Sequence, residues 1–237
     1  WKAPVRGLGI SSPVVWGDRV FVTSQVGRGA RRAGNHPTLV QGGSPAAAGE
    51  RALGGSAVAG GAKVSFLVTA LSRIDGRKLW EYELAAEGTL AEVHDKHNLA
   101  SSSPLTDGQR LYAWFGTGQI VALDMAGKPI WSRHLGRDYA PFDINWGHSS
   151  SPALFNGALI LLTYHQPMAH LLSLDAASGK TTWRVERGRD VNSYSTPLVV
   201  QAPGGPELIV NSSEGVSGHN PSTGQLLWHI QESNRFP

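Results

Sequence analysis

Histidine is the residue type in this sequence best suited to metal chemistry. His94 and His97 are three residues apart, and His148 follows in a later polar segment. Three imidazoles and a water form the ligand set of several catalytic zinc sites. A His-x-x-His pair outside a helix does not align both rings on one ion, however, so we expect loop histidines and no metal site.

Acid–base and nucleophilic chemistry have weaker signals. Asp95 and Asp143 stand in two of the same polar segments, but loop carboxylates usually stay solvated and keep their ordinary pKa. The run from Gly147 to Ser151 lacks the closing glycine of a nucleophile elbow. We therefore expect no catalytic residue, and we favour a protein that is not an enzyme.

The elements that must position these residues form a repeat array. Four times a glycine is followed four residues later by tryptophan, and successive tryptophans are about 50 residues apart, a period typical of propeller blades. A run of Ser or Thr closed by proline comes before each pair. The pairs are Gly76 and Trp80, Gly127 and Trp131, Gly179 and Trp183, and Gly224 and Trp228. The hydroxyl runs are Ser11–Pro13, Ser101–Pro104, Ser149–Pro152 and Ser195–Pro197.

The third unit shows the internal order of one repeat. Asn156-Gly157 between two apolar runs is a strong hairpin signal, because both central residues of the tight turn need positive φ. Gly17-Asp18, Asp107-Gly108 and Gly204-Gly205 stand at equivalent positions in the other units. A third strand, a turn at 177–180 and a fourth strand follow. Each unit is thus predicted to be a four-stranded antiparallel meander, which buries its faces by stacking on its neighbours around an axis. The small hydroxyl residues suit the narrow inner rim, and the proline suits the first position of a strand.

Composition supports an all-β fold and excludes several partners. The chain has 237 residues, 41% hydrophobic residues and 29 glycines, and helix signals are nearly absent. The net charge of +3 is scattered, so we expect no nucleic-acid partner. There are no cysteines, which excludes disulfides and thiolate metal sites. No apolar stretch approaches the roughly 18 residues of a transmembrane segment.

The phrase from Leu174 to Lys180 with Trp183 resembles the tryptophan-docking motif of the pyrroloquinoline-quinone-like (PQQ-like) β-propeller repeats. The resemblance implies that the four glycines and four tryptophans are structural docking residues, each indole packing on the glycine region of the next blade. Ser72 and Asn220 replace the motif's aspartate, and the second unit is one residue short. Propellers of this family usually have seven or eight blades, so we expect residues 1–237 to form one partial propeller of about four blades.

The resemblance leads to two functions. BamB-like and other secreted bacterial PQQ-like propellers imply a non-catalytic scaffold for protein–protein interaction, periplasmic or secreted, with no cofactor. Quinoprotein alcohol dehydrogenases imply PQQ and calcium, and they commonly carry a vicinal cysteine pair. The absence of cysteine and the short chain favour the scaffold. A fragment of a quinoprotein dehydrogenase remains the alternative, and a sensor or adhesion module is a third possibility.

Ligands are expected where the connections between blades emerge on one face. Polar, aromatic and imidazole groups there suit a protein, small-molecule or sugar ligand. Missing blades or a second chain are the partners expected for open sheet faces. The candidate residues of the loop face are His94, Asp95, His97, Asn98, Asp143, Asn145, Trp146, His148, Asn192 and Tyr194.

One segment departs from the repeat. Residues 27–63, between the second and third strands of the first blade, are rich in Gly, Ala and Arg and show no periodicity. Such a composition buries too little apolar area to offset the ordering entropy. We expect a flexible insertion rather than a second domain, with a role as a lid or docking loop left open.

Overall fold

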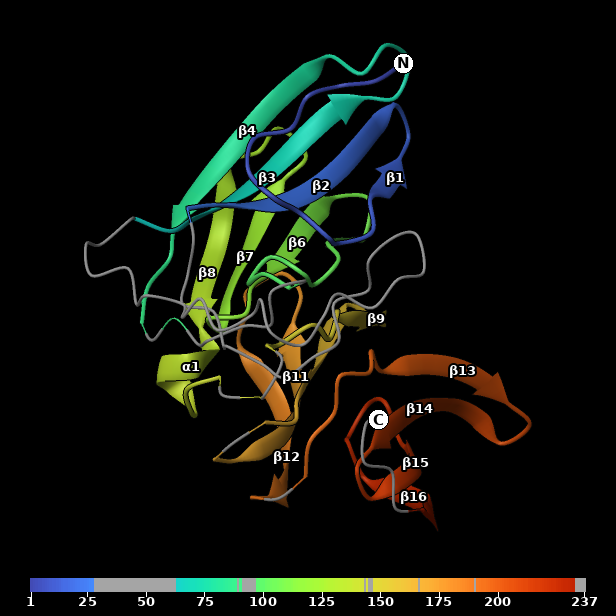
Figure 1. Ribbon diagram of the computed structural model, residues 1–237. Coiled ribbons are helices and arrows are strands. Elements are labelled where there is room, and N and C mark those ends of the chain that lie inside the picture. The colour runs from blue at the N-terminus through green and yellow to red at the C-terminus, as the bar shows by residue number, and fades with distance from the viewer. Residues whose placement is uncertain are drawn as a thin grey trace, which may run out of the picture.

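The computed structural model describes residues 1–27, 63–88, 90, 97–142, 144, 147–165, 167–189 and 191–232. These residues form four antiparallel sheets, each of four strands in sequence order, which lie one after another from the top to the bottom of Figure 1. The first blade contains β1 (Val14–Trp16), β2 (Arg19–Val26), β3 (Ser65–Ser72) and β4 (Lys78–Ala85). The second contains β5 (Leu105–Thr106), β6 (Arg110–Trp114), β7 (Gln119–Asp124) and β8 (Pro129–His134). The third contains β9 (Ala153–Phe155), β10 (Ala158–Thr163), β11 (Ala169–Asp175) and β12 (Thr181–Gly188). The fourth contains β13 (Leu198–Ala202), β14 (Gly205–Ser212), β15 (Gly215–His219) and β16 (Leu226–Gln231). The predicted all-β architecture of four-stranded blades is confirmed.

The hairpin turns follow from local backbone preferences. Asn156 and Gly157 have φ of 45° and 75°, and they join Phe155 to its partner Ala158. In the fourth blade Ala202 pairs with Gly205. The loop there is therefore residues 203–204, one position before the Gly204-Gly205 turn that the sequence suggested.

A short helix, α1 (Leu135–Asp138), is the one described helical element and was not expected. It directly follows β8, and the His134 side chain accepts a hydrogen bond from the Arg137 amide. Tyr139 comes after the helix, and its hydroxyl lies 2.7 Å from Thr181 Oγ1. The helix thus ends the outer strand of the second blade with a contact to the third.

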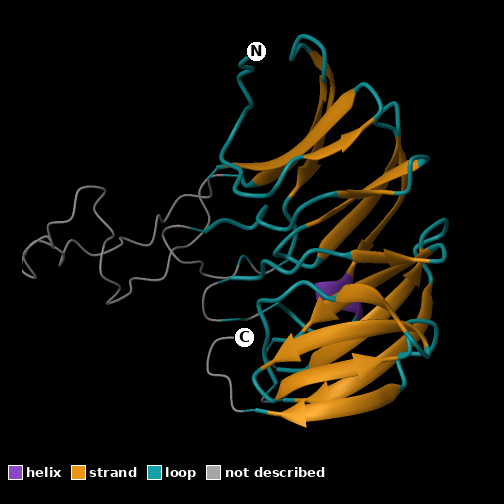
Figure 2. Ribbon diagram, turned by 90° about the vertical axis from the view of Figure 1, so that its right-hand side faces the viewer, coloured by secondary structure: helices purple, strands orange, loops and turns teal. Residues whose placement is uncertain are grey.

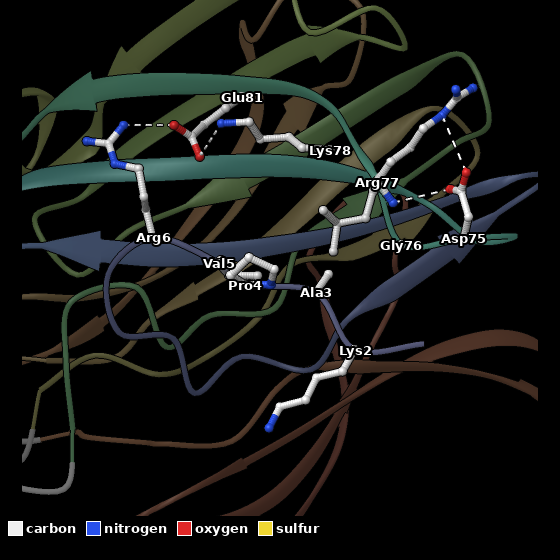
Figure 3. Close-up of a pocket in the computed structure, with 11 residues that line it drawn as sticks. Lys2, Ala3, Pro4, Val5, Arg6, Asp75, Gly76, Arg77, Lys78 and Glu81 are labelled. Atoms are coloured by element: carbon white, nitrogen blue, oxygen red, sulfur yellow. Dashed lines mark hydrogen bonds and ion pairs between the residues drawn. The ribbon is translucent and has the colours of Figure 1, made fainter.

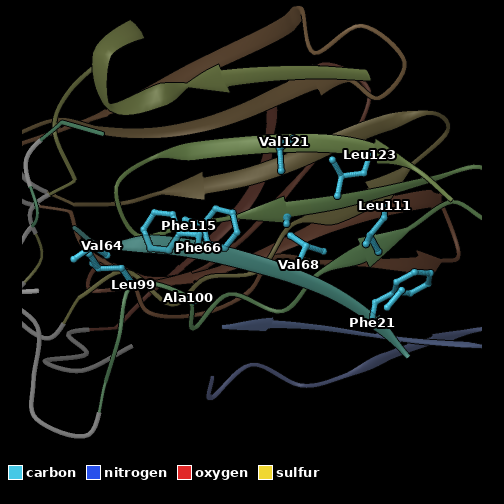
Figure 4. Close-up of a cluster of buried hydrophobic side chains, with 12 residues drawn as sticks. Phe21, Val64, Phe66, Val68, Leu99, Ala100, Leu111, Phe115, Val121 and Leu123 are labelled. Carbon is cyan, nitrogen blue, oxygen red and sulfur yellow. The ribbon is translucent and has the colours of Figure 1, made fainter. Parts of the chain in front are cut away.

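The core lies between the blades. Side chains alternate across each strand, so Phe66, Val68 and Ala70 face the second blade and are fully buried. Phe66 stacks on Phe115 at a ring-centroid distance of 4.3 Å (Figure 4). Two similar clusters lie between the second and third and between the third and fourth blades.

The hydroxyl residues before each proline form hydrogen bonds from blade to blade. The amide of Ser12 donates to Ser103 Oγ at 2.9 Å, the amide of Ser103 donates to Ser151 Oγ at 2.9 Å, and the amide of Ser151 donates to Thr196 Oγ1 at 3.0 Å. We call these contacts the hydroxyl ladder. The sequence suggested only that small side chains were needed here, but the hydroxyl oxygens also accept the main-chain N–H groups of the preceding blade.

The tryptophan of each of the first three blades lies on a glycine of the next. A Cβ added to Gly127 would be 2.7 Å from the ring of Trp80, and one added to Gly179 would be 2.7 Å from Trp131. The indole N–H of Trp80 donates to the Met125 carbonyl at 3.0 Å. The indole N–H of Trp131 likewise donates to the Ala176 carbonyl at 3.1 Å. Trp183 lies on Gly224, and Trp1 lies on Gly76. Residues 1–5 form no strand, yet Trp1 takes the place of a preceding blade's tryptophan.

Residues 27–63, the insertion predicted from the sequence, stand between the end of β2 and the start of β3. Residues 28–62, most of its length, lie outside the described residues, so its flexibility and its role as a lid or docking loop stay predictions. In the described part of the chain, no helix is long and apolar enough to cross a membrane.

Candidate binding face

The connections between blades gather on one side of the molecule, away from the β1–β2-type hairpin turns (Figure 2). They are tied to the turns between second and third strands: the Gly116 amide donates to Leu99 O at 2.7 Å, and the Ser193 amide donates to Tyr164 O at 3.1 Å. We call this side the connection face. It comprises the described residues of the three inter-blade connections and of the turns that they contact.

Five candidate residues of this face are described, and several of them hold the connections in place. The side-chain Nδ2 of Asn98 donates to Leu8 O at 3.0 Å, and its Oδ1 accepts from the main-chain N–H of Ala100 at 2.8 Å. The Asn192 carbonyl accepts from the Ser213 amide at 2.9 Å. The described candidates are His97, Asn98, His148, Asn192 and Tyr194. His94, Asp95, Asp143, Asn145 and Trp146 lie outside the described residues.

His148 is the centre of a buried aromatic cluster. Its ring lies 4.2 Å from Trp114 and 5.0 Å from Phe142, measured between centroids, and it is only 4% exposed. Phe142 also lies 4.1 Å from the ring of His165. We call Trp114, Phe142, His148 and His165 the imidazole cluster.

The sequence did not single out three members of this cluster. Trp114 ends β6, and His165 follows β10 by two residues. The available signal was that Trp114-Phe115 and Tyr164-His165 each come at or just after the end of the second strand of neighbouring blades. Stacked blades bring such equivalent positions together.

The electrostatics of the cluster favour a neutral His148 ring. Burial, reinforced by the nearby His165 and His97, holds the pKa of His148 well below its usual range. His148 Nε2 and Trp114 Nε1 are buried with no hydrogen-bond partner among the described residues. A neutral imidazole enclosed by aromatic rings serves packing better than proton transfer to a substrate, because a substrate has no access to it.

The described residues of the connection face contain no metal site. The three-imidazole arrangement considered from the sequence needs His94, which lies outside the described residues. Within the part of the chain that the structure describes, no group of three or more His, Cys, Asp or Glu residues is placed to hold a metal ion. The structure instead brings His148 near His165 and His97.

A cavity of about 470 Å³ lies on the open side of the first blade, between residues 2–6 and the end of β3 with the turn to β4 (Figure 3). Glu81 pairs with Arg6 at 2.8 Å and with Lys78 at 3.5 Å along its rim. The lining has four cationic side chains, of Lys2, Arg6, Arg77 and Lys78, and two carboxylates, of Asp75 and Glu81, so the cavity carries a net positive charge. None of the candidate residues lines it.

The repeated four-stranded blades define the class of protein first: a partial β-propeller of the PQQ-like repeat type. A family model described as outer membrane protein assembly factor BamB matches residues 1–141 and again residues 65–235. The two overlapping matches span nearly the whole chain, and the chain belongs to this BamB-like family of PQQ-like repeats.

Solved structures share the fold at low identity. BamB from Moraxella catarrhalis is 17% identical, with a TM-score of 0.51, and the alignment covers 97% of this chain and 51% of BamB. Quinohemoprotein alcohol dehydrogenase ADHIIG from Pseudomonas putida HK5 is 14% identical, with a TM-score of 0.60, covering 98% of this chain and 35% of the enzyme. A europium-containing methanol dehydrogenase is 12% identical, with a TM-score of 0.53, and the alignment covers 73% of this chain and 40% of the enzyme. The chain thus spans about half of that BamB and about a third of that alcohol dehydrogenase. No curated protein matches it.

Proposed function

We propose that this chain is a non-catalytic binding scaffold of the bacterial envelope, periplasmic or secreted, which recognises protein partners. The observation that carries the proposal is the match of residues 1–141 and 65–235 to the family model described as outer membrane protein assembly factor BamB. The structure adds an apolar sheet face on the fourth blade, on the side that points away from the third. Leu198 and Ile230 on this face are 60% and 61% exposed, whereas Leu208 and Val210 on the opposite face are fully buried. Exposed apolar sheet faces usually mark interaction sites.

The open face is a continuous surface across four strands. Leu198, Ile209, Gly218 and Trp228 form one cross-strand row, and Val216 pairs with Ile230 in the next row. Because cross-strand partners point to the same side of a sheet, these side chains share one face. We call it the open face.

The occupant that fits the open face is a further four-stranded blade of the same repeat. Thr196 has the position in its blade that Ser12, Ser103 and Ser151 have in theirs. At this position the main-chain N–H of each serine donates to a hydroxyl oxygen of the next blade. Trp228 stands where Trp80 and Trp131 dock. Its indole instead donates to Glu207 of its own sheet at 2.7 Å and lies over Gly218. The fourth blade therefore has a hydroxyl residue and a tryptophan at the two joining positions, but the indole of Trp228 contacts its own sheet. We propose that these tryptophan contacts fasten blade to blade, and that the partner supplies a positive-φ glycine and a Ser/Thr-Pro start.

The described candidate residues also support binding rather than catalysis. The side-chain amide of Asn98 holds one connection, Asn192 holds another through its main-chain N–H and carbonyl, and His148 is enclosed by aromatic rings. A protein, small-molecule or sugar ligand on the connection face would meet the outer surface of these connections.

A quinoprotein dehydrogenase fragment is the second candidate, favoured by the TM-score of 0.60 with ADHIIG. Its cofactors would be PQQ and calcium. The described residues do not fit them: the rings of the imidazole cluster pack directly on one another, and no described carboxylate group forms a cation cage.

A titration separates the two functions. The protein would be titrated with PQQ and calcium while the quinone absorbance and the melting temperature are followed. A bound cofactor stabilises the folded state, by about 2.7 kcal/mol at 100 times its Kd. We expect neither a saturable absorbance change nor a shift in Tm. A saturable shift of both would replace the scaffold with the dehydrogenase.

A further inference from the structure

The fourth blade has a buried histidine where the other three have leucine. Leu71, Leu123 and Leu174 each stand one residue after the partner of the docking tryptophan, at the same β-bulge. In the fourth blade Gly218 is the partner of Trp228, and His219 takes the leucine position. All four side chains are buried, and His219 has no exposed surface.

His219 is held in one tautomer. Its Nδ1 lies 3.0 Å from the Gly224 carbonyl, which can only accept, so Nδ1 carries the proton. Its Nε2 lies 2.9 Å from Ser217 Oγ and therefore accepts from that hydroxyl. The neutral ring satisfies both neighbours.

The histidine supports the joint between the third and fourth blades. Gly224, whose carbonyl it binds, is the glycine on which Trp183 of the third blade lies; a Cβ there would be 2.7 Å from the indole. Val185 also contacts this glycine, at 2.8 Å from the same added Cβ. The imidazole, the turn and the docked indole thus form one chain of contacts.

The charged groups around His219 do not compensate a positive ring. Arg187 on β12 and His229 on β16 both oppose its protonation, and the nearby carboxylate of Glu214 is engaged by Arg187 at 3.0 Å. Burial is the largest effect: it lowers the pKa of His219 below its usual value, against the opposing influence of the Gly224 hydrogen bond.

We propose that His219 makes the joint between the third and fourth blades sensitive to acid, so that its protonation releases the fourth blade from the third. The direction follows from linkage. A histidine with a lowered pKa in the folded state contributes stability that is fully present above its unfolded pKa of about 6.5. This contribution is lost as the pH falls from about 6.5 toward the folded-state pKa, because the released blade then binds the extra proton. Between pH 7.5 and 5.5 the release equilibrium shifts by at most about tenfold for this one group.

Hydrogen exchange with mass spectrometry tests the proposal on the 237-residue chain. Protection of β13–β16 and of β1–β4 would be compared at pH 7.5 and 5.5, after correction for the intrinsic exchange rates. In the unsubstituted chain, we expect the protection of β13–β16 to fall up to about tenfold further than that of β1–β4. His219→Leu, which restores the residue of the other blades, removes this extra loss.

Two further variants keep the test decisive. His219→Gln offers an amide donor to Gly224 without titrating, and it should also remove the extra loss even if the leucine variant packs poorly. His229→Gln removes an exposed imidazole on β16 that opposes the protonation of His219, so it should reduce the loss without removing it. If His219→Gln shows the same pH dependence as the unsubstituted chain, the proposal is wrong.

Discussion

Replacing Trp131 by alanine is expected to lower the free energy of unfolding by about 3 kcal/mol, the low end of the cost for a large aromatic core side chain, because Trp131 is only partly buried against the core. The indole lies on Gly179, donates to the Ala176 carbonyl at 3.1 Å and contacts the ring of Tyr112 at 6.2 Å between centroids. All three contacts join the second blade to the third or stabilise that joint. Equilibrium urea unfolding followed by circular dichroism measures the loss.

Trp228→Ala is the matched control. Trp228 has the same place in its repeat, but its indole bonds Glu207 of its own sheet and lies on the open face. We expect its loss to cost less than about 2 kcal/mol, because few contacts with another blade disappear. Equal losses for the two variants would show that docking on the next glycine contributes nothing special.

Gly179→Ala is expected to lower the free energy of unfolding by about 2–5 kcal/mol, although it adds only a methyl group. The substitution combines two costs: left-handed backbone, at φ of 72°, costs about 1–2 kcal/mol for a residue with a Cβ. The methyl group would also be 2.7 Å from the Trp131 ring, and overpacking typically costs about 1–3 kcal/mol.

Gly157→Ala isolates the first of these costs. Gly157 has φ of 75°, but an added Cβ would meet no atom within 4 Å. We expect this variant to lower the free energy of unfolding by about 1–2 kcal/mol, measured by the same urea unfolding. If Gly179→Ala costs no more than Gly157→Ala, the glycine at the docking position is needed only for its backbone conformation.

The blades were predictable because their signals are local. Asn156-Gly157 specifies its turn by backbone preference alone, and the tryptophan period repeats this information along the chain. The position of the fourth blade's turn was displaced by one residue because both Gly204 and Gly205 tolerate unusual φ, so composition did not distinguish the two registers.

The contacts between blades were less predictable because they join residues far apart in the chain. The hydroxyl ladder joins Ser103 to Ser151, and the imidazole cluster joins Trp114 to His148. Neither pairing follows from the spacing of one repeat; each depends on how neighbouring blades stack. His219 was visible in the sequence as a departure from the repeat, but its burial and its bond to Gly224 needed the structure.

The most direct test of the scaffold is to give the open face the partner that it fits. A tandem protein would carry a second copy of residues 189–232 directly after Glu232. Trp228 would then face the Gly224 of the added copy, and the main-chain N–H of Thr196 would face the hydroxyl of the added Thr196. Hydrogen exchange of the original β13–β16 would be measured with and without the added blade, and with Trp228→Ala as the control. We predict slower exchange of these strands when the blade is added, an effect that Trp228→Ala weakens, because each repeat of an array is stabilised by its neighbour. Unchanged exchange beside an unfolded added blade would contradict the claim that the open face is a docking surface.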